Sequence, residues 1–153
     1  MTTRNDFTPD EWTALHRGVT GSGMLVSLSD RDFTDSFGEA GAMAKYMSGQ
    51  QVAGATELMR DIARQGGTGF GLTTNPEKLR AETMAAITAA LAALKAKSPD
   101  DVQPYRDLVL GVSEAVANAK GGGTSAVEAQ MLAEIRAALG RDAAPATGGG
   151  APT

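Results

Sequence analysis

The strongest constraint on this sequence is a repeated helix-start signal, in which a capping residue is followed by proline. The signal occurs at Thr8-Pro9, Asn75-Pro76 and Ser98-Pro99. The capping side chain accepts a hydrogen bond from a first-turn amide, and proline suits the first helical position because an N–H there would have no partner. Apolar residues then recur at helical spacing, most clearly over 79–94. We therefore predict an all-α fold, a compact bundle of five to six helices.

The apolar stripes place these helices along the chain. We expect helices over 9–29, 36–47, 56–65, 76–97, 99–120 and 125–140, with a weaker segment over 48–54 that interrupts the second one. Residues 1–141 form a single helical domain, and residues 142–153 are predicted to be a disordered tail because they are rich in Ala, Pro and Gly and lack large apolar groups. Two interpretations fit the glycines near position 20: one helix, continuous or kinked, or two helices with a break. We favour the first.

The same glycines predict a close helix contact. Ala14, Gly18 and Gly21 lie on nearly one face of a continuous helix, so they would form a flat strip where another backbone approaches closely. The sequence leaves open whether that neighbour belongs to this chain or to a second one.

Composition excludes several classes of function. The net charge of −4, with scattered Lys and Arg, disfavours nucleic acid as a partner, since a polyanion requires a concentrated basic face. The chain has no cysteine, and hence no disulfide and no sulfur-based zinc site. Its polar N-terminus lacks a signal-peptide core, and no apolar stretch reaches the roughly 18 residues that span a bilayer. We expect a cytoplasmic protein with no cofactor and no direct membrane insertion.

One acidic segment is a candidate metal site. Its carboxylates are Asp30, Asp32, Asp35 and Glu39, and hard cations bind clustered oxygen ligands. The EF-hand pattern fails, because the sixth position counted from Asp30 is Asp35 rather than glycine and the twelfth is Gly41 rather than glutamate. The alternative, which we favour, is a solvated loop that caps a helix.

Two further features could carry chemistry, but neither is typical of an enzyme. His16 is the only histidine, and no nucleophile accompanies it, so a packing or solvent-facing role is expected rather than catalysis. The glycine-rich segment 66–71 could bring amides to a phosphate. However, it lacks the preceding strand and the spacing of nucleotide-binding motifs, which favours a flexible connector.

Two segments show a similar order of features: an apolar helix, a turn, a Ser-x-x-Glu helix start and a second apolar helix. One leads from Leu28 to Glu39 and onward, and the other from Asn118 to Ser125, Glu128 and Ile135. This arrangement resembles the tellurite-resistance TerB-like helical domains, which contain such a unit twice. The resemblance implies an interaction module linked to metal stress and membrane-associated complexes. The second unit departs from it, with Lys120 where the family has an aspartate.

The start of the chain, Phe7 to Trp12, is also similar to that of short, uncharacterised bacterial helical proteins, which implies no activity. Our primary prediction is a non-enzymatic helical module for protein interaction or self-association, in bacterial stress response. Its partner would be another protein or a further copy of the chain. The alternative is a TerB-like domain that binds a metal cation through the acidic segment. The third hypothesis is an enzyme acting through His16 and nearby carboxylates.

Overall fold

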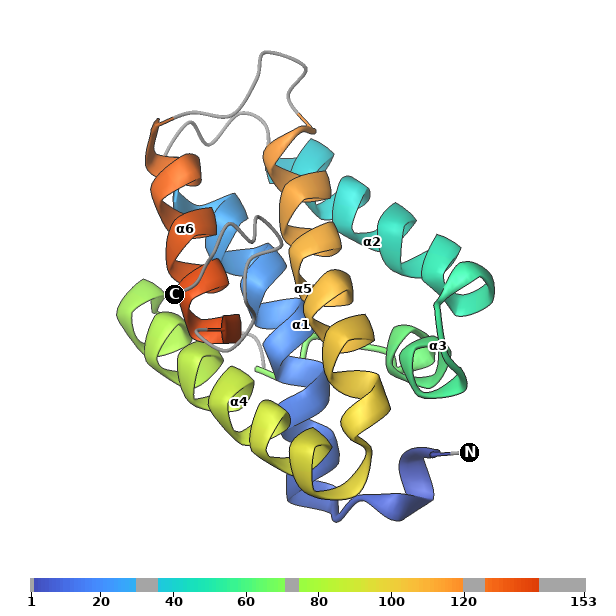
Figure 1. Cartoon of the computed structure of the whole chain (residues 1–153). Helices are drawn as coiled ribbons and strands as arrows, with labels where there is room; N and C mark the ends of the chain where they lie inside the picture. Colours follow the sequence, from blue (N-terminus) through green and yellow to red (C-terminus); the bar gives the residue numbers. More distant parts are fainter. Residues whose placement is uncertain (1, 30–35, 71–74, 120–125, 141–153) are drawn as a thin grey trace, which may run out of the picture.

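The computed structural model describes residues 2–29, 36–70, 75–119 and 126–140, and within them every regular element is helical (Figure 1). The α-helices are α1 (Pro9–Ser29), α2 (Ser36–Ala53), α3 (Glu57–Arg64), α4 (Pro76–Lys97), α5 (Val102–Ala117) and α6 (Ala126–Gly140). Two short 3-10 helices, η1 (Arg4–Asp6) and η3 (Pro99–Asp101), precede α1 and α5. The predicted all-α bundle of five to six helices is confirmed.

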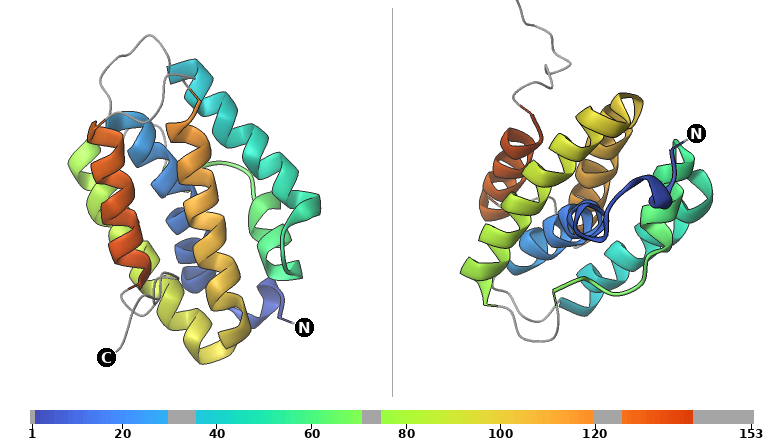
Figure 2. Two further views of the ribbon diagram at one scale, coloured as in Figure 1. Left: turned by 45° about the horizontal axis from the view of Figure 1, so that its top comes forward. Right: turned by 90° about the horizontal axis from the view of Figure 1, so that it is seen from below.

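Helix α1 lies at the centre of the bundle. It packs most extensively against α4 and α5, and also contacts α6 and α2. Helices α4 and α6 lie on one side of the molecule and α2 and α3 on the other, as all the views show (Figures 1 and 2). The buried core side chains come from α1, α3, α4, α5 and α6, and α2 packs partly buried residues such as Met43 and Met47 against them. The largest fully buried apolar side chains are Tyr105, Leu15, Leu58, Met59, Ile62, Leu79, Ile87, Leu94, Ile135 and Leu139.

The start of α1 has the predicted Thr8 cap, and Glu11 completes a capping box. The Thr8 amide donates to Glu11 Oε1 at 3.1 Å, and the Glu11 amide donates to Thr8 Oγ1 at 3.1 Å. Phe7 and Trp12, which flank this box, are both buried in the same core cluster, as a hydrophobic staple requires. Lys97 at the end of α4 also binds Glu11, at 2.6 Å, so the beginning of α1 is attached to the end of α4.

Helix α1 continues without a break through its glycines to Ser29. A side chain at Gly18 would collide with the Tyr105 hydroxyl, and one at Gly21 would collide with Thr83. The close neighbours of the glycine strip therefore belong to α5 and α4 of the same chain. Glycine lowers intrinsic helix stability, but here it permits contacts that a larger residue would block.

The predicted interruption over 48–54 is wrong, because α2 extends to Ala53 and the chain turns at Gly54. Helix α3 then begins after Thr56, whose hydroxyl accepts a hydrogen bond from the Met59 amide at 3.3 Å. On α2, Met43 and Met47 are partly buried against the core, whereas Ala44 is exposed.

The Asn75-Pro76 signal begins α4 as predicted, with the Lys78 amide donating to Asn75 Oδ1 at 2.7 Å. The Ser98-Pro99 signal instead begins the 3-10 turn η3, and α5 starts at Val102. Pro104 then lies in the first turn of α5, where its missing N–H breaks no helical hydrogen bond.

Helix α6 buries Leu132, Ile135 and Leu139, as its apolar stripe predicts, whereas Met131 is partly buried. The predicted caps and stops around 121–125 and the predicted tail at 142–153 lie outside the described residues. So do the two connections, 30–35 and 120–125, on which the comparison of the two helix-loop-helix units depends. That internal similarity stays a prediction.

Candidate interaction surface

The acidic segment is the first candidate site, and most of it lies outside the described part of the chain. Asp30, Asp32 and Asp35 are not described, and Glu39 lies in α2 without a described side chain. The metal prediction therefore remains untested. Among the residues whose side chains are described, no three histidines or carboxylates come together as a metal ion would need.

His16 is deeply buried, with only 5% of its surface exposed, which settles the choice between a packing and a solvent-facing role. Its Nε2 atom has no hydrogen-bond partner in the described structure. Burial lowers the pKa of His16, because the imidazolium ion would lose its water shell, and the nearby Arg17 charge acts in the same direction. A hydrogen bond between the ring and the Gln65 backbone opposes that decrease. The burial of His16 is that of a packing residue.

The segment that covers His16 is the glycine-rich connection after α3. The Arg17 Nε atom donates to the Gly69 carbonyl at 2.7 Å, and the Thr20 hydroxyl donates to the Thr68 carbonyl at 2.6 Å. Gly67 and Gly69 have positive φ angles of 75° and 87°, a conformation that favours glycine. These glycines thus let residues 66–70 dock on α1, which is the role of a structural connector.

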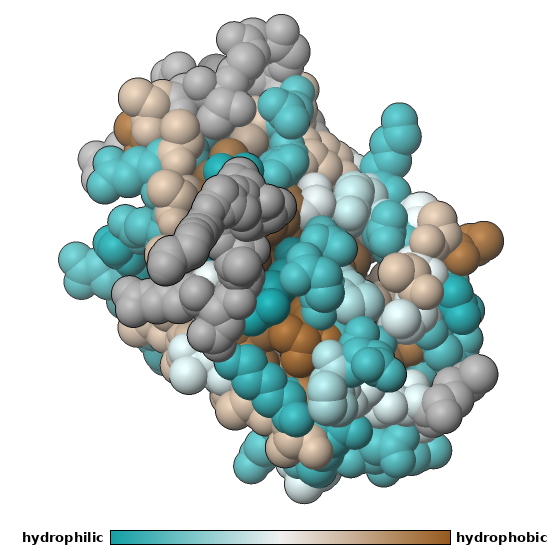
Figure 3. All heavy atoms as spheres, viewed as in Figure 1, coloured by the Kyte–Doolittle hydropathy of each residue, from teal (hydrophilic) through white to brown (hydrophobic). Residues whose placement is uncertain are grey.

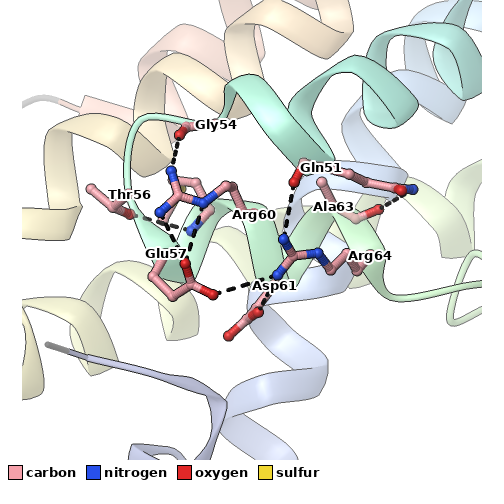
Figure 4. Close-up of polar contacts among 9 residues, drawn as sticks. Gln51, Gly54, Thr56, Glu57, Arg60, Asp61, Ala63 and Arg64 are labelled. Carbon is pink, nitrogen blue, oxygen red and sulfur yellow. Dashed lines mark hydrogen bonds and ion pairs between the residues drawn. The ribbon is translucent and has the colours of Figure 1, made fainter.

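Charged residues at the α2–α3 corner form a polar network that the sequence did not reveal (Figure 4). Arg60 donates to the Gly54 carbonyl at 2.9 Å, and Arg64 donates to the Gln51 carbonyl at 3.2 Å. Both arginines also pair with Glu57, whose pKa is lowered mainly by its hydrogen bond to Arg60. The two arginines hydrogen-bond backbone carbonyls at the C-terminal end of α2 and so connect α3 to α2. The charged groups of this network are therefore engaged in interactions that stabilise the fold.

One hollow in the described structure lies between α4 and α6, near their C-terminal ends. It is an open groove of about 600 Å³. Its lining consists mostly of small or apolar residues and contains one charged side chain: Thr88, Leu91, Ala92, Lys95, Ala137, Ala138, Leu139 and Gly140. An open groove with apolar walls and a charge at its edge can receive a side chain or a helix of another protein.

The outer face of α4 beside this groove carries several small residues between charged ones. Its exposed positions include Ala81, Ala85, Thr88, Ala89, Ala92 and Ala96. The sequence contained this signal, since these positions recur at helical spacing opposite the buried stripe that includes Ile87 and Leu94. Because alanine occurs on both the buried and the exposed face of α4, the pattern of core residues does not distinguish these exposed alanines.

A smaller hollow of about 180 Å³ lies at the other end of α4. Leu28, which is 45% exposed, contributes to it together with Met131 and Arg80. The face of the molecule in Figure 3 shows hydrophilic side chains interspersed with hydrophobic ones over most of its area. On this face, apolar side chains are thus exposed only in limited patches.

Comparisons with known proteins give no assignment: no family model, no curated protein and no solved structure matches this chain. The resemblance to TerB-like domains accordingly stays a prediction. No helix among the described residues is both long enough and apolar enough to cross a membrane.

Proposed function

We propose that this chain is a non-enzymatic helical module that binds a protein surface through the outer faces of α4 and α6. The observation that carries the proposal is the open groove of about 600 Å³ between these helices, with Leu91 and Leu139 in its walls. Both side chains are more than nine-tenths buried, so the groove is an extension of the packed core rather than a gap between mobile side chains. Such a rigid apolar recess is what a docking helix needs.

Among the described residues, the charged and titratable groups considered above are either buried or hydrogen-bonded within the fold, which supports a binding role over an enzymatic one. His16, the candidate catalytic residue of the sequence, is buried beneath the connector. The most elaborate charged network among the described residues, at the α2–α3 corner, hydrogen-bonds backbone carbonyls of the fold itself. The setting we propose, bacterial stress response, rests on the TerB-like resemblance of residues 118–135 alone.

A site-specific photo-crosslinking experiment tests the proposed surface. A photoreactive amino acid would replace Ala92, in the groove, or Ala44, an exposed alanine on α2 at the opposite side of the molecule. In cells that naturally express the chain, we expect covalent adducts with protein from position 92 and few from position 44. Equal yields at the two positions, or none at position 92, would refute this docking surface.

A further inference from the structure

His16 is a buried titratable side chain, and part of its cover is a segment that is not itself buried. The connector, residues 66–70, passes over the ring, so that a side chain added at Gly69 would begin 3.4 Å from His16 Nδ1. Each connector residue is exposed or only partly buried, and none belongs to the buried core. His16 itself is 5% exposed. The ring is thus shielded from water by a segment that contributes little to the stability of the bundle.

Polar contacts from α1 hold the connector in place. Arg17 and Thr20 donate hydrogen bonds to the Gly69 and Thr68 carbonyls, at 2.7 Å and 2.6 Å. A segment attached mainly by a few side-chain hydrogen bonds opens at a much lower free energy than the helices that form the core. The connector can therefore leave α1 while the bundle stays folded.

We propose that protonation of His16 opens the connector, so that the fold contains an acid-sensitive switch. The imidazolium ion has two N–H donors, and the Nε2 atom has no acceptor in the described structure. A buried charge with an unsatisfied donor is costly, and opening the connector lets water solvate the ring. Such a switch acts on α1 and the connector and is independent of the proposed α4–α6 docking surface.

The charges around His16 oppose its protonation while the connector is closed. Arg17 is a like charge beside the ring, and only the Gln65 backbone, which bonds the ring, acts in the other direction. Residues 66–70 have no titratable side chain. The charged side chains of α3 pair with one another at the α2–α3 corner. Helix α5 packs on the far side of α1, since Gly18, which meets Tyr105, points about 200° away from His16 around the helix.

Backbone NMR relaxation and circular dichroism of the full chain, between about pH 7.5 and about pH 4.5, test the switch. The order parameters of residues 66–70 should fall from about 0.85 to below about 0.6, while those of α1 and the helical signal stay unchanged. The midpoint should lie below 6.5, the ordinary pKa of histidine, because closure of the connector disfavours the charged ring. In His16→Gln the connector should stay rigid throughout. A wild-type connector that stays rigid until the helices unfold, or one that loosens equally in His16→Gln, would overturn the proposal.

A matched pair of threonine variants tests the attachment of the connector. Thr20→Val removes the hydroxyl that donates to the Thr68 carbonyl and keeps the branched shape of the side chain. Because closure is weaker in this variant, the opening midpoint should rise, by about one pH unit for each tenfold gain in the opening equilibrium. Thr13→Val, at an exposed position of the same helix, should leave the midpoint unchanged. Equal midpoints in the two variants would exclude the proposed link between His16 and the connector.

Discussion

The Tyr105 hydroxyl donates a hydrogen bond to the Leu15 carbonyl at 2.8 Å, and it occupies the space where a side chain at Gly18 would begin. Tyr105 is fully buried, and burial raises the pKa of its hydroxyl well above the usual range. This one contact joins α5 to the middle of α1 and accounts for a glycine inside a long helix.

Gly18→Ala should therefore destabilise the fold by about 1–3 kcal/mol through overpacking, although alanine is the better helix former. The effect should depend on Tyr105. In a Tyr105→Phe background the nearest ring atom is 3.4 Å from the added methyl group, an ordinary contact, so the same substitution should be neutral or slightly stabilising. Urea unfolding of the four proteins of this cycle measures the coupling. Equal costs in both backgrounds would contradict the proposed collision.

Gly21→Leu should destabilise the protein by about 3 kcal/mol, since the space beside Gly21 is filled by Thr83 and by the Phe70 ring, 3.0 Å from where the side chain would begin. Two controls isolate packing from helix propensity. Thr13→Leu is at an exposed position of α1 and should be mild, whereas Gly49→Ala, in open space on α2, should stabilise by up to about 1 kcal/mol. Thermal unfolding gives the comparison, and a gain in stability from Gly21→Leu would refute the packing argument.

Folding stability should decrease as the pH falls below about 6.5, because of His16. Its pKa is lower in the folded protein than its ordinary value of 6.5. Between the two pKa values the unfolded chain binds more protons than the folded one, so acid favours unfolding until the pH is below the folded pKa. Urea midpoints measured between about pH 7.5 and pH 5 should show this slope, above the range in which Glu11 and Glu57, with their lowered pKa values, begin to contribute.

His16→Gln removes the titrating group and should flatten the pH dependence in that interval. The variant and the wild type can differ in stability at any one pH, because the test compares how the urea midpoint changes with pH. A variant with the wild-type slope would show that another group is responsible.

Calcium, magnesium and zinc should not raise the melting temperature specifically, because the acidic segment departs from the EF-hand pattern at its sixth and twelfth positions. Differential scanning fluorimetry with each ion tests this expectation. A stoichiometric stabilisation that disappears in both Asp32→Ala and Glu39→Ala would favour the metal-binding alternative. Both variants are needed, since losing Glu39 alone also removes a predicted helix-capping group.

Local signals determined where most helices begin. The Thr8 box and the Asn75 cap have the hydrogen bonds that the sequence predicts, because a cap depends only on residues within one turn. The same signal at Ser98 produced a 3-10 turn, since Ser98 is buried and donates its hydroxyl hydrogen to Asp101 at 2.5 Å. That contact and the packing around it place the start of α5 three residues later.

Tertiary structure alone decided what the helix faces contact. The sequence placed Gly18 and Gly21 on one strip but could not tell an internal neighbour from a second chain, because that choice depends on Tyr105 and Thr83, far along the chain. The sequence likewise places alanines on both the buried and the exposed face of α4. Only the position of α6 showed which of them form the wall of a groove and which belong to the core. Periodicity fixes the directions of side chains around a helix axis, whereas burial depends on contacts between residues distant in sequence.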